Sequence, residues 1–201
     1  MIINCEQGTE EWSAYRIGSV GASSIDKIIT STGKRSTQRK KYMYQLAGEI
    51  ITGQKAESFS TPAMEEGIRR EAESRELFEM VNDVEVQQVG LIVPDNKPGW
   101  HCSPDGIIDY TDHHVGFEVK NPNMATHIEY LDKGVLPTKY KLQVQMSMYV
   151  SKYTQWFFMS HFPGIKPLIL KVDRDEEIIS VIDKELKLFV AELTNLVERL
   201  Q

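Results

Sequence analysis

The chain has 201 residues, a length that suits one domain with its own hydrophobic core, so we expect a single domain over residues 1–201. Hydrophobic residues make up 41% and charged residues 26% of the sequence, which is typical of a soluble globular protein. No apolar stretch approaches the roughly 20 residues needed to cross a bilayer, and the N-terminus lacks the pattern of a secretory signal. The two cysteines, Cys5 and Cys102, require no disulfide, so a reducing cytoplasm is the expected location.

Charge is unevenly distributed along the chain, whose formal net charge is −6. The basic run comprises Lys34, Arg35, Arg39, Lys40 and Lys41, and an acidic run comprises Asp173, Asp175, Glu176 and Glu177. Such runs are as often solvated faces as binding surfaces. The composition therefore neither requires nor excludes a nucleic-acid partner.

Three helices are expected near the N-terminus. Residues 10–16 follow Thr9, a favourable N-cap, and carry acidic residues in the first turn. Ser23 and Asp26 fit a capping box for a second helix. The basic run leads into a third helix over about residues 40–51, which ends at Gly53.

A longer helix is expected from Thr61, its cap, and Pro62, its first residue, to about Met80. Its apolar stripe has helical spacing and consists of Met64, Ile68, Ala72 and Phe78. Gly67 lies inside this helix, where glycine costs roughly 1 kcal/mol relative to alanine, so we expect a backbone or ligand to approach closely there. Glu71 falls beside the stripe, either on a solvated face or facing that ligand.

The middle of the chain changes to β-structure. β-branched and aliphatic residues dominate residues 84–93, which end at a turn over 95–99. Residues 107–110 and 115–120 then indicate a hairpin across the loop 111–114.

The last third of the chain contains one ambiguous segment. Pro137 could begin a helix, whereas residues 142–146 alternate like a strand, so both interpretations stay open. Residues 154–162 and 168–172 indicate two strands. An apolar residue every three or four positions predicts a long final helix, and these residues are Ile178, Ile182, Leu186, Phe189, Leu193, Leu196 and Leu200. The sum predicts an α/β or α+β fold, a central mixed β-sheet flanked by helices.

Two short segments carry residues suited to chemistry. Asp105 lies at the start of the expected hairpin, and Glu118-Val119-Lys120 follows thirteen residues later. Because side chains alternate along a strand, Glu118 and Lys120 share one face while Val119 points into the core. The hairpin would therefore bring two carboxylates and one ammonium group together.

Carboxylates without any soft ligand suit hard, oxygen-seeking ions such as Mg²⁺ or Mn²⁺. Such an ion lowers the pKa of bound water and stabilises charge on a scissile phosphate. Lys120 could orient that water or neutralise the phosphate. The pattern indicates phosphodiester hydrolysis more clearly than it indicates a substrate.

Several further elements follow one another along the chain. They are Glu11-Trp12, Tyr15-Arg16-Ile17-Gly18, Ala22-Ser23, Gly67 to Glu71, Cys102 to Gly106, Glu118 to Lys120 and Gln143-Val144-Gln145. In this order they resemble the family of phage lambda exonuclease and the YqaJ-type viral recombinase exonucleases, which have a PD-(D/E)xK, restriction-endonuclease-like core. The resemblance covers most of the chain and favours a helix around Gln143.

The resemblance implies roles for individual residues at a metal centre. Asp105, Glu118, the Val119 carbonyl and Glu71 would hold the metal, which would be Mg²⁺ with Mn²⁺ as a substitute, as two ions. Lys120 would act on the attacking water, and Gln143 would support the site.

The resemblance also implies a pocket for the 5′-phosphate of a DNA end, formed by Arg16, Ser23 and Ser103. A guanidinium fork and hydroxyl groups suit a phosphate, and a helix start at Ser23 would add anion affinity. Trp12 would be a DNA contact, although a tryptophan is more often part of a core.

The implied protein is a phage or prophage nuclease in the cytoplasm of a bacterial host, with residues 1–201 as its nuclease domain. It would digest linear double-stranded DNA from 5′ to 3′, release 5′-mononucleotides and leave 3′ single strands for recombination by annealing. The implied assembly is a homotrimer that encloses DNA, with the basic run lining its channel and a single-strand annealing protein as partner. No membrane is involved.

The sequence departs from the family pattern in places. Asn121-Pro122 replaces the usual Cys-Pro pair, the C-terminus is shorter than in the lambda enzyme, and Gln145 competes with Gln143 for the site role. His101, His113 and His114 are expected to be exposed or satisfied histidines and not metal ligands, as given by their positions on a strand edge and in the hairpin loop.

The same motifs occur in three other kinds of protein. An endonuclease on the same fold stays open, and so does a non-catalytic module that binds DNA or an annealing protein, although retention of clustered carboxylates argues against the latter. The CRISPR-associated exonuclease with an iron–sulphur cluster needs four cysteine ligands, and two cysteines exclude it.

Overall fold

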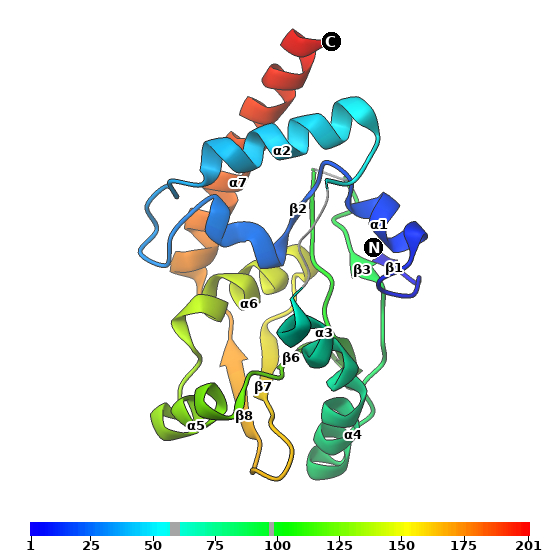
Figure 1. Cartoon of the computed structure of the whole chain (residues 1–201), viewed down its shortest axis with the longest axis vertical. Helices are drawn as coiled ribbons and strands as arrows, with labels where there is room; N and C mark the ends of the chain where they lie inside the picture. Colours follow the sequence, from blue (N-terminus) through cyan, green and yellow to red (C-terminus); the bar gives the residue numbers. More distant parts are fainter. Residues whose placement is uncertain (57–60, 97–98) are drawn as a thin grey trace.

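The computed structural model describes residues 1–56, 61–96 and 99–201. The Met64 side chain and residues 97–98 of the expected turn lie outside the described residues. A helical part with α2 (Arg39–Thr52) and α7 (Glu176–Leu200) adjoins a part that contains the central β-sheet (Figure 1). Within the described ranges, no helix is both long and apolar enough to span a membrane.

The central sheet is mixed, as predicted. Its strand order is β5-β6-β7-β8, and the strands are β5 (Gly106–Asp109), β6 (His114–Lys120), β7 (Gln155–Ser160) and β8 (Leu168–Asp173). The β5–β6 and β7–β8 pairs are antiparallel, whereas β6 and β7 are parallel. The predicted hairpin is confirmed, with Gly106 opposite Phe117.

Two short strand pairs position the N-terminal segments. Strands β1 (Ile2–Ile3) and β3 (Leu91–Ile92) pair antiparallel, and β2 (Val20–Gly21) and β4 (Trp100–His101) pair parallel. The second pair places the segment after α1 (Glu10–Arg16) beside the segment that leads to Ser103.

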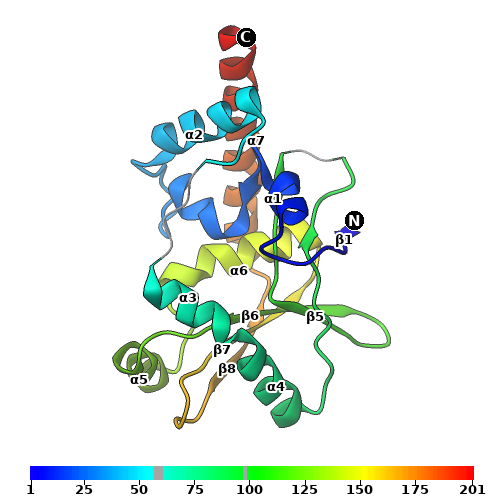
Figure 2. The same ribbon diagram turned by 45° about the vertical axis from the view of Figure 1, so that its right-hand side comes forward.

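Helices cover both faces of the sheet (Figure 2). Phe78 of α4 (Glu71–Asn82) packs against Phe117 and Val119 of β6, with ring centroids 4.5 Å apart for the two phenylalanines. On the other face, α6 (Thr138–Ser151) contributes Val144 and Met148 to a cluster that includes Trp156. The strand alternation expected for β6 therefore divides its side chains between two packed layers.

A second core joins the helices. The short 3-10 helix η1 (Ala22–Lys27), α2, α6 and α7 bury aliphatic residues against one another. Ile182, Leu186 and Phe189 of α7 are fully buried, as their period predicted, whereas Leu200 is 59% exposed. Asp175 caps α7 by accepting a hydrogen bond from the Ile178 N–H at 3.2 Å.

Most predicted helices are confirmed. The Thr9 hydroxyl accepts a bond from the Trp12 N–H at the start of α1, and Gly53 ends α2 at φ 67°. The ambiguous segment 142–146 is helical, inside α6. One helix, α5 (Met124–Lys133), was not predicted, although Asn123 caps its start and Gly134 ends it.

Three predictions were wrong in detail. Ser23 is not a cap: it lies inside η1, whose N-cap is Gly21, and no side-chain cap bond forms there. Within residues 84–93, β-structure is limited to β3 and two isolated bridges, from Gln87 to Ile107 and from Ile92 to Cys102, because the partner segments are themselves short. The strand predicted over 154–162 is shortened to β7.

The long helix predicted from residue 62 to residue 80 is interrupted at Arg70, between α3 (Pro62–Arg69) and α4. At the break the Gly67 carbonyl accepts the Arg70 N–H at 3.2 Å, an i to i+3 bond, and it also accepts a bond from Asn121 Nδ2 at 3.1 Å, which stabilises this tightened turn. A Cβ at Gly67 would lie 3.9 Å from the Asn121 carbonyl oxygen, so the backbone approach is real but loose.

Candidate active site

The register of the β5–β6 hairpin places Asp105 beside the Glu-x-Lys segment. The Asp105 N–H donates to the Phe117 carbonyl at 3.0 Å, and Asp105 Oδ2 accepts from the Val119 N–H at 2.7 Å. Both bonds hold the carboxylate against the backbone of β6. The convergence predicted from the thirteen-residue spacing therefore follows from ordinary strand pairing.

Glu118 and Lys120 project together from the β6 face that α6 covers. Glu118 is 2% exposed, and its Oε1 accepts a hydrogen bond from Gln143 Nε2 at 2.5 Å. The same oxygen forms an ion pair with Lys120 Nζ. Gln145 is elsewhere: its Nε2 donates to the Asp173 carbonyl at 3.0 Å, and its Oε1 accepts from the Asp175 N–H at 2.9 Å. Gln143 alone of the two lies at the site.

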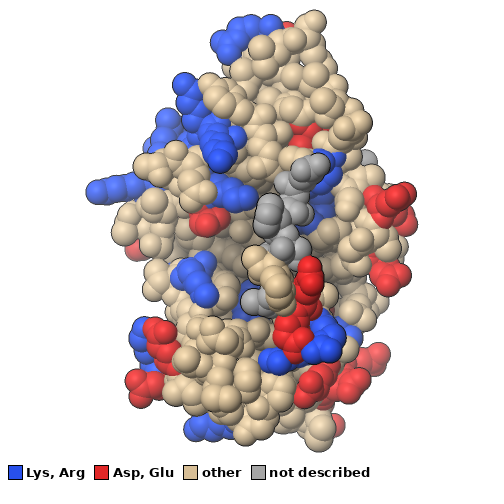
Figure 3. Space-filling model, in the orientation of Figure 1, with Lys and Arg blue, Asp and Glu red and all other residues tan. Residues whose placement is uncertain are grey.

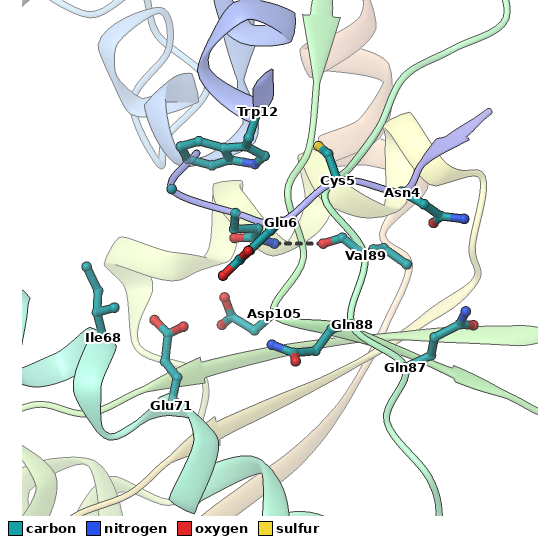
Figure 4. Close-up of a pocket in the computed structure, with 12 residues that line it drawn as sticks. Asn4, Cys5, Glu6, Trp12, Ile68, Glu71, Gln87, Gln88, Val89 and Asp105 are labelled. Atoms are coloured by element: carbon teal, nitrogen blue, oxygen red, sulfur yellow. Dashed lines mark hydrogen bonds between the residues drawn. The ribbon is translucent and has the colours of Figure 1, made fainter. Parts of the chain in front are cut away.

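Glu71 is the first residue of α4 and joins this group from the opposite side. Figure 4 shows Glu71 and Asp105 pointing into the same pocket, which has a volume of about 760 Å³. We call Glu71, Asp105, Glu118 and Lys120 the carboxylate centre.

A chain of hydrogen bonds ties the start of α4 to the end of β6. Asn121, next to Lys120, donates to the Gly67 carbonyl, and its Oδ1 accepts from Ser74 Oγ at 2.7 Å. Ser74 Oγ also lies 2.9 Å from Nδ1 of the buried His161. This network fixes the helix break, and with it Glu71, relative to the strand that carries Glu118.

The carboxylate centre holds more negative than positive charge. Burial, and next the neighbouring Glu118, raise the pKa of Asp105 well above its usual range. Burial also raises the pKa of Glu71. Although burial opposes it, the pKa of Lys120 is raised by Glu118 and Asp105, so Lys120 stays protonated.

These residues fit a divalent cation. The raised pKa values of Asp105 and Glu71 mean that their charged forms are disfavoured in the absence of a cation. A divalent cation that prefers oxygen ligands would stabilise both carboxylates in the charged form. Within the described part of the chain, no three His, Cys, Asp or Glu side chains gather closely enough to enclose an ion. Carboxylate oxygens suit an ion that keeps part of its coordination shell for water and substrate, as Mg²⁺ usually does in proteins.

A second pocket of about 180 Å³ adjoins the carboxylate centre. Its lining includes Arg16, Ser23 and Ser103, which we call the Arg16 pocket, together with Asp105, Glu118, Lys120 and Gln143. Residues from α1, η1 and the loop after β4 thus meet residues of the sheet, as the family resemblance implied.

Arg16 is held from two sides. Its guanidinium carbon lies 3.7 Å from the centre of the Trp12 ring, and its Nε donates to His101 Nε2 at 3.2 Å. The Trp12 indole in turn donates to the Gly90 carbonyl at 3.0 Å. No salt bridge joins Arg16 to a carboxylate in the described ranges, and the nearby Glu11 and Asp26 are not its partners.

Ser103 Oγ is buried and has no hydrogen-bond partner among the residues that the structure describes. A buried hydroxyl group without a partner is uncommon, and one that lines a pocket is suited to a polar ligand. The Arg16 pocket therefore offers a cation and a free hydroxyl group to an anion.

Sequence reasoning missed some residues around the site. Gln7 donates from Nε2 to the carbonyls of Val89, at 2.9 Å, and Pro104, at 2.8 Å, and so fixes the loop before Asp105. No pattern in the sequence signals this role. His101 was predicted to be exposed or satisfied, and it is satisfied: it is buried and contacts Arg16 and Ser19.

His113 and His114, the two histidines predicted for the hairpin loop, lie as expected. His113 and His114 are exposed in and beside the hairpin loop. His113 Nδ1 lies 2.7 Å from Asp112, and His114 Nδ1 lies 2.5 Å from Asp109. Neither contributes to the carboxylate centre.

Comparison with known proteins supplies the family. A family model described as a YqaJ-like viral recombinase domain matches residues 11–154, a range that includes most of the residues of both pockets. A search of curated proteins finds no match.

Solved structures of exonucleases are similar over almost the whole chain. An alkaline exonuclease from Laribacter hongkongensis (LHK-Exo) matches with a TM-score of 0.86 and 30% identity, covering 96% of each chain. Its complex with dAMP matches with a TM-score of 0.85 and 31% identity over the same shares. A phage-related exonuclease from Haemophilus somnus 129PT shares the fold at 14% identity, with a TM-score of 0.62 and coverage of 100% and 97%. The chain thus belongs to the YqaJ-like viral recombinase family, lambda-type exonucleases of the PD-(D/E)xK fold, and is a nuclease.

Proposed function

We propose that the protein is a metal-dependent exonuclease that digests linear double-stranded DNA from 5′ ends, releasing 5′-mononucleotides and leaving 3′ single strands. One observation carries this proposal: a single pocket is lined both by Arg16, Ser23 and Ser103 and by three residues of the carboxylate centre, Asp105, Glu118 and Lys120. An anion site beside a hydrolytic centre suits a strand whose terminal phosphate and next phosphodiester are bound together.

The proposed reaction removes one nucleotide at a time. With the 5′-phosphate at Arg16, the next phosphorus lies at the carboxylate centre, where water attacks it and the bond to the 3′-oxygen breaks. The freed nucleotide keeps its 5′-phosphate, and the shortened strand receives a new one. Each cleavage thereby regenerates the group that the Arg16 pocket binds. The dAMP bound in the similar Laribacter hongkongensis enzyme is a mononucleotide of the kind this reaction releases.

The residues of the carboxylate centre have separate roles. Lys120 remains charged because Glu118 and Asp105 raise its pKa, so it orients water and neutralises the phosphate and does not act as a base. Gln143 fixes Glu118 through its 2.5 Å bond, and the Val119 N–H fixes Asp105. Glu71 contributes a third carboxylate from α4.

The metal would be held by Asp105, Glu118, Glu71 and the Val119 carbonyl, and we propose Mg²⁺, with Mn²⁺ as a substitute and two ions in the full site. When bound, such ions lower the pKa of water and neutralise developing charge on the phosphate.

Digestion of end-labelled linear duplex tests the proposal. We expect loss of the 5′ label as mononucleotide with Mg²⁺ and no loss with EDTA. A 5′-hydroxyl end should start more slowly than a 5′-phosphate end, and covalently closed circular DNA should remain intact. Early release of a 3′ label would refute the polarity, and cleavage of the closed circle would indicate an endonuclease.

We further propose a homotrimer that encloses DNA and works with a single-strand annealing protein, as the family resemblance implies. Of the basic run, Lys34, Lys40 and Lys41 are exposed and available to line a channel, whereas Arg35 and Arg39 form ion pairs with Glu185 and Glu192. Light scattering of the protein tests the trimer: a monomer at working concentration would overturn it without affecting the nuclease assignment.

A further inference from the structure

His101 is a buried histidine that the proposed reaction does not use. It lies on β4, where it pairs with Gly21 of β2, and it is 1% exposed. It contacts two polar side chains: Arg16 Nε at 3.2 Å from its Nε2, and Ser19 Oγ at 2.9 Å from its Nδ1. It also precedes Ser103 by two residues, so one backbone segment carries it and part of the Arg16 pocket.

The two contacts define the protonation of the ring. Because Arg16 Nε always carries a proton, His101 Nε2 must accept, which leaves the proton on Nδ1 to be donated to Ser19. Burial and the nearby Arg16 charge lower the pKa of His101 to about 3, so the ring is neutral at every pH at which the protein would work. A neutral acceptor is what an arginine needs in order to be oriented without losing its charge.

The contact leaves the rest of the guanidinium free. The Trp12 ring covers one face of the Arg16 guanidinium, with 3.7 Å between the ring centre and the guanidinium carbon, and Arg16 Nε donates to His101. Within the described residues, neither terminal nitrogen of Arg16 forms a hydrogen bond. A Cβ added to Gly21 would lie 3.1 Å from His101 Nε2 and 3.9 Å from Arg16 Nη2, so the glycine leaves just enough room for this pair. The terminal fork is therefore held in one orientation beside the unpartnered Ser103 hydroxyl group.

We propose that His101 is a positioning residue for end recognition: through its Nε2 acceptor it orients Arg16, so that the terminal fork binds the 5′-phosphate of the DNA end. This inference rests on the proposed function, because it assigns His101 to the phosphate pocket of that reaction. A carboxylate at the same place would neutralise Arg16 and compete with the phosphate. Histidine orients the guanidinium and leaves its charge for the ligand.

A matched pair of amide variants tests the proposal. His101→Gln brings a carbonyl oxygen near the position of Nε2, whereas the shorter His101→Asn reaches only the position of Nδ1 and Ser19. Wild type and variants digest duplexes of one sequence with either a 5′-phosphate or a 5′-hydroxyl end, and the ratio of kcat/KM gives the end preference. His127→Gln is the control, because His127 is equally buried but contacts Ser160 and the Lys166 carbonyl.

We expect His101→Asn to reduce the end preference about tenfold, through KM for the phosphorylated end, with little change in kcat at saturating DNA. His101→Gln should retain most of the preference. His127→Gln should lower the melting temperature without changing the preference. Binding of the two duplexes in Ca²⁺, measured by fluorescence anisotropy, should give the same order without turnover.

The outcomes separate this inference from the proposed function. If wild type does not distinguish the two ends, the phosphate pocket is wrong and the role of His101 falls with it. A second outcome is that wild type prefers the 5′-phosphate end but His101→Asn and His101→Gln have the same end preference as each other, either both like wild type or both reduced. That result would overturn only the acceptor role of His101. Ser19→Ala removes the contact that keeps the proton on His101 Nδ1, so it should reduce the end preference less than His101→Asn does. An unchanged end preference in Ser19→Ala would contradict the assignment of that proton to Nδ1.

Discussion

The carboxylate centre and the Arg16 pocket share a boundary but are opposite in charge and in construction. In the centre, one buried and two half-buried carboxylates outnumber the one ammonium group, and the pKa values of Asp105 and Glu71 are raised. In the pocket, a cation and a hydroxyl group lack anionic partners in the described part of the chain. One region is prepared for a cation and the other for an anion, as substrate phosphates with their metal ions would require.

The two regions also differ in what holds them. The register of β5 and β6 fixes Asp105 and Glu118, so one hairpin determines most of the centre. The Arg16 pocket is assembled from three short segments joined by the two-residue pairing of β2 and β4 and by side-chain contacts. We therefore expect changes in the centre to abolish chemistry, and changes in the pocket to alter the choice of DNA end.

The largest predicted effect is the loss of cleavage when a carboxylate of the centre is replaced by an amide, and it distinguishes the role of the centre from that of the Arg16 pocket. Asp105→Asn or Glu118→Gln should slow cleavage at least about a thousandfold, and equally for 5′-phosphate and 5′-hydroxyl ends, because the loss is in the hydrolytic step. Asp109→Asn is the matched control, since Asp109 ends β5, the strand that begins directly after Asp105, but is exposed and pairs with His114. Near-normal activity of Asp105→Asn in saturating Mg²⁺ would contradict the assignment.

A second prediction concerns how Glu71 is positioned in the centre. Asn121→Ala removes the bonds to the Gly67 carbonyl and Ser74, so α4 should shift against β6 and the cleavage rate should fall about tenfold. Asn123→Ala is the control: it removes only the cap of α5 and should cost about 1 kcal/mol of unfolding free energy without slowing cleavage. Equal cleavage rates for the two variants would show that the network does not position Glu71.

The carboxylate centre was easier to predict from the sequence than the Arg16 pocket, because one hairpin forms most of the centre whereas three separate segments form the pocket. Strand alternation and hairpin spacing are local properties, so Asp105, Glu118 and Lys120 could be placed together from the sequence. The family resemblance named Arg16, Ser23 and Ser103, but nothing local predicted that His101 would orient Arg16. That contact depends on the parallel pairing of β2 with β4, strands 80 positions apart in register.

Two errors in the predicted fold have the same origin. The helix break at Arg70 is stabilised by a bond from Asn121, more than fifty residues away, to the Gly67 carbonyl, and helical periodicity does not predict that contact. Ser23 satisfied the local rule for an N-cap, yet β2 leads directly into η1 and gives that place to Gly21. At Arg70 and at Ser23, tertiary contacts therefore override the preference of the local sequence.

A third prediction tests the excess negative charge through stability. Since the pKa of Asp105 is raised in the folded state, its contribution to stability is present below the ordinary aspartate pKa and is lost as pH rises through the raised value. At neutral pH in EDTA, Asp105→Asn should therefore be more stable than wild type by about 1 kcal/mol, and the difference should disappear in acid. The Asn side chain can still accept the Val119 N–H.

Thermal unfolding as a function of pH and Mg²⁺ measures this effect. Mg²⁺ should stabilise wild type and have little effect on the variant, by linkage of binding to folding. A variant that is less stable than wild type in EDTA at neutral pH would show that the carboxylate is satisfied without a cation.

The smallest predicted effect concerns exposed positive charge, in contrast with the half-buried charge of the Arg16 pocket. Figure 3 shows lysine and arginine side chains gathered over the part of this face where α2 begins. Lys40 and Lys41 there are exposed, whereas Arg35 pairs with Glu185 at 2.9 Å. Exposed lysines attract the DNA backbone through screened, sequence-independent forces, so they should help the enzyme to load and should not distinguish one end from another.

Replacing both Lys40 and Lys41 with glutamine should therefore raise KM about two- to threefold at low salt, and reduce its salt dependence, without changing kcat or the end preference. Replacing Lys133 and Lys187 removes the same charge from α5 and α7 and is the matched control. Steady-state digestion of both duplexes over a range of salt concentrations measures all three quantities. A change in end preference in the Lys40/Lys41 variant would mean that the surface lysines share the role assigned to Arg16, and the distinction between attraction at the surface and recognition in the pocket would be lost.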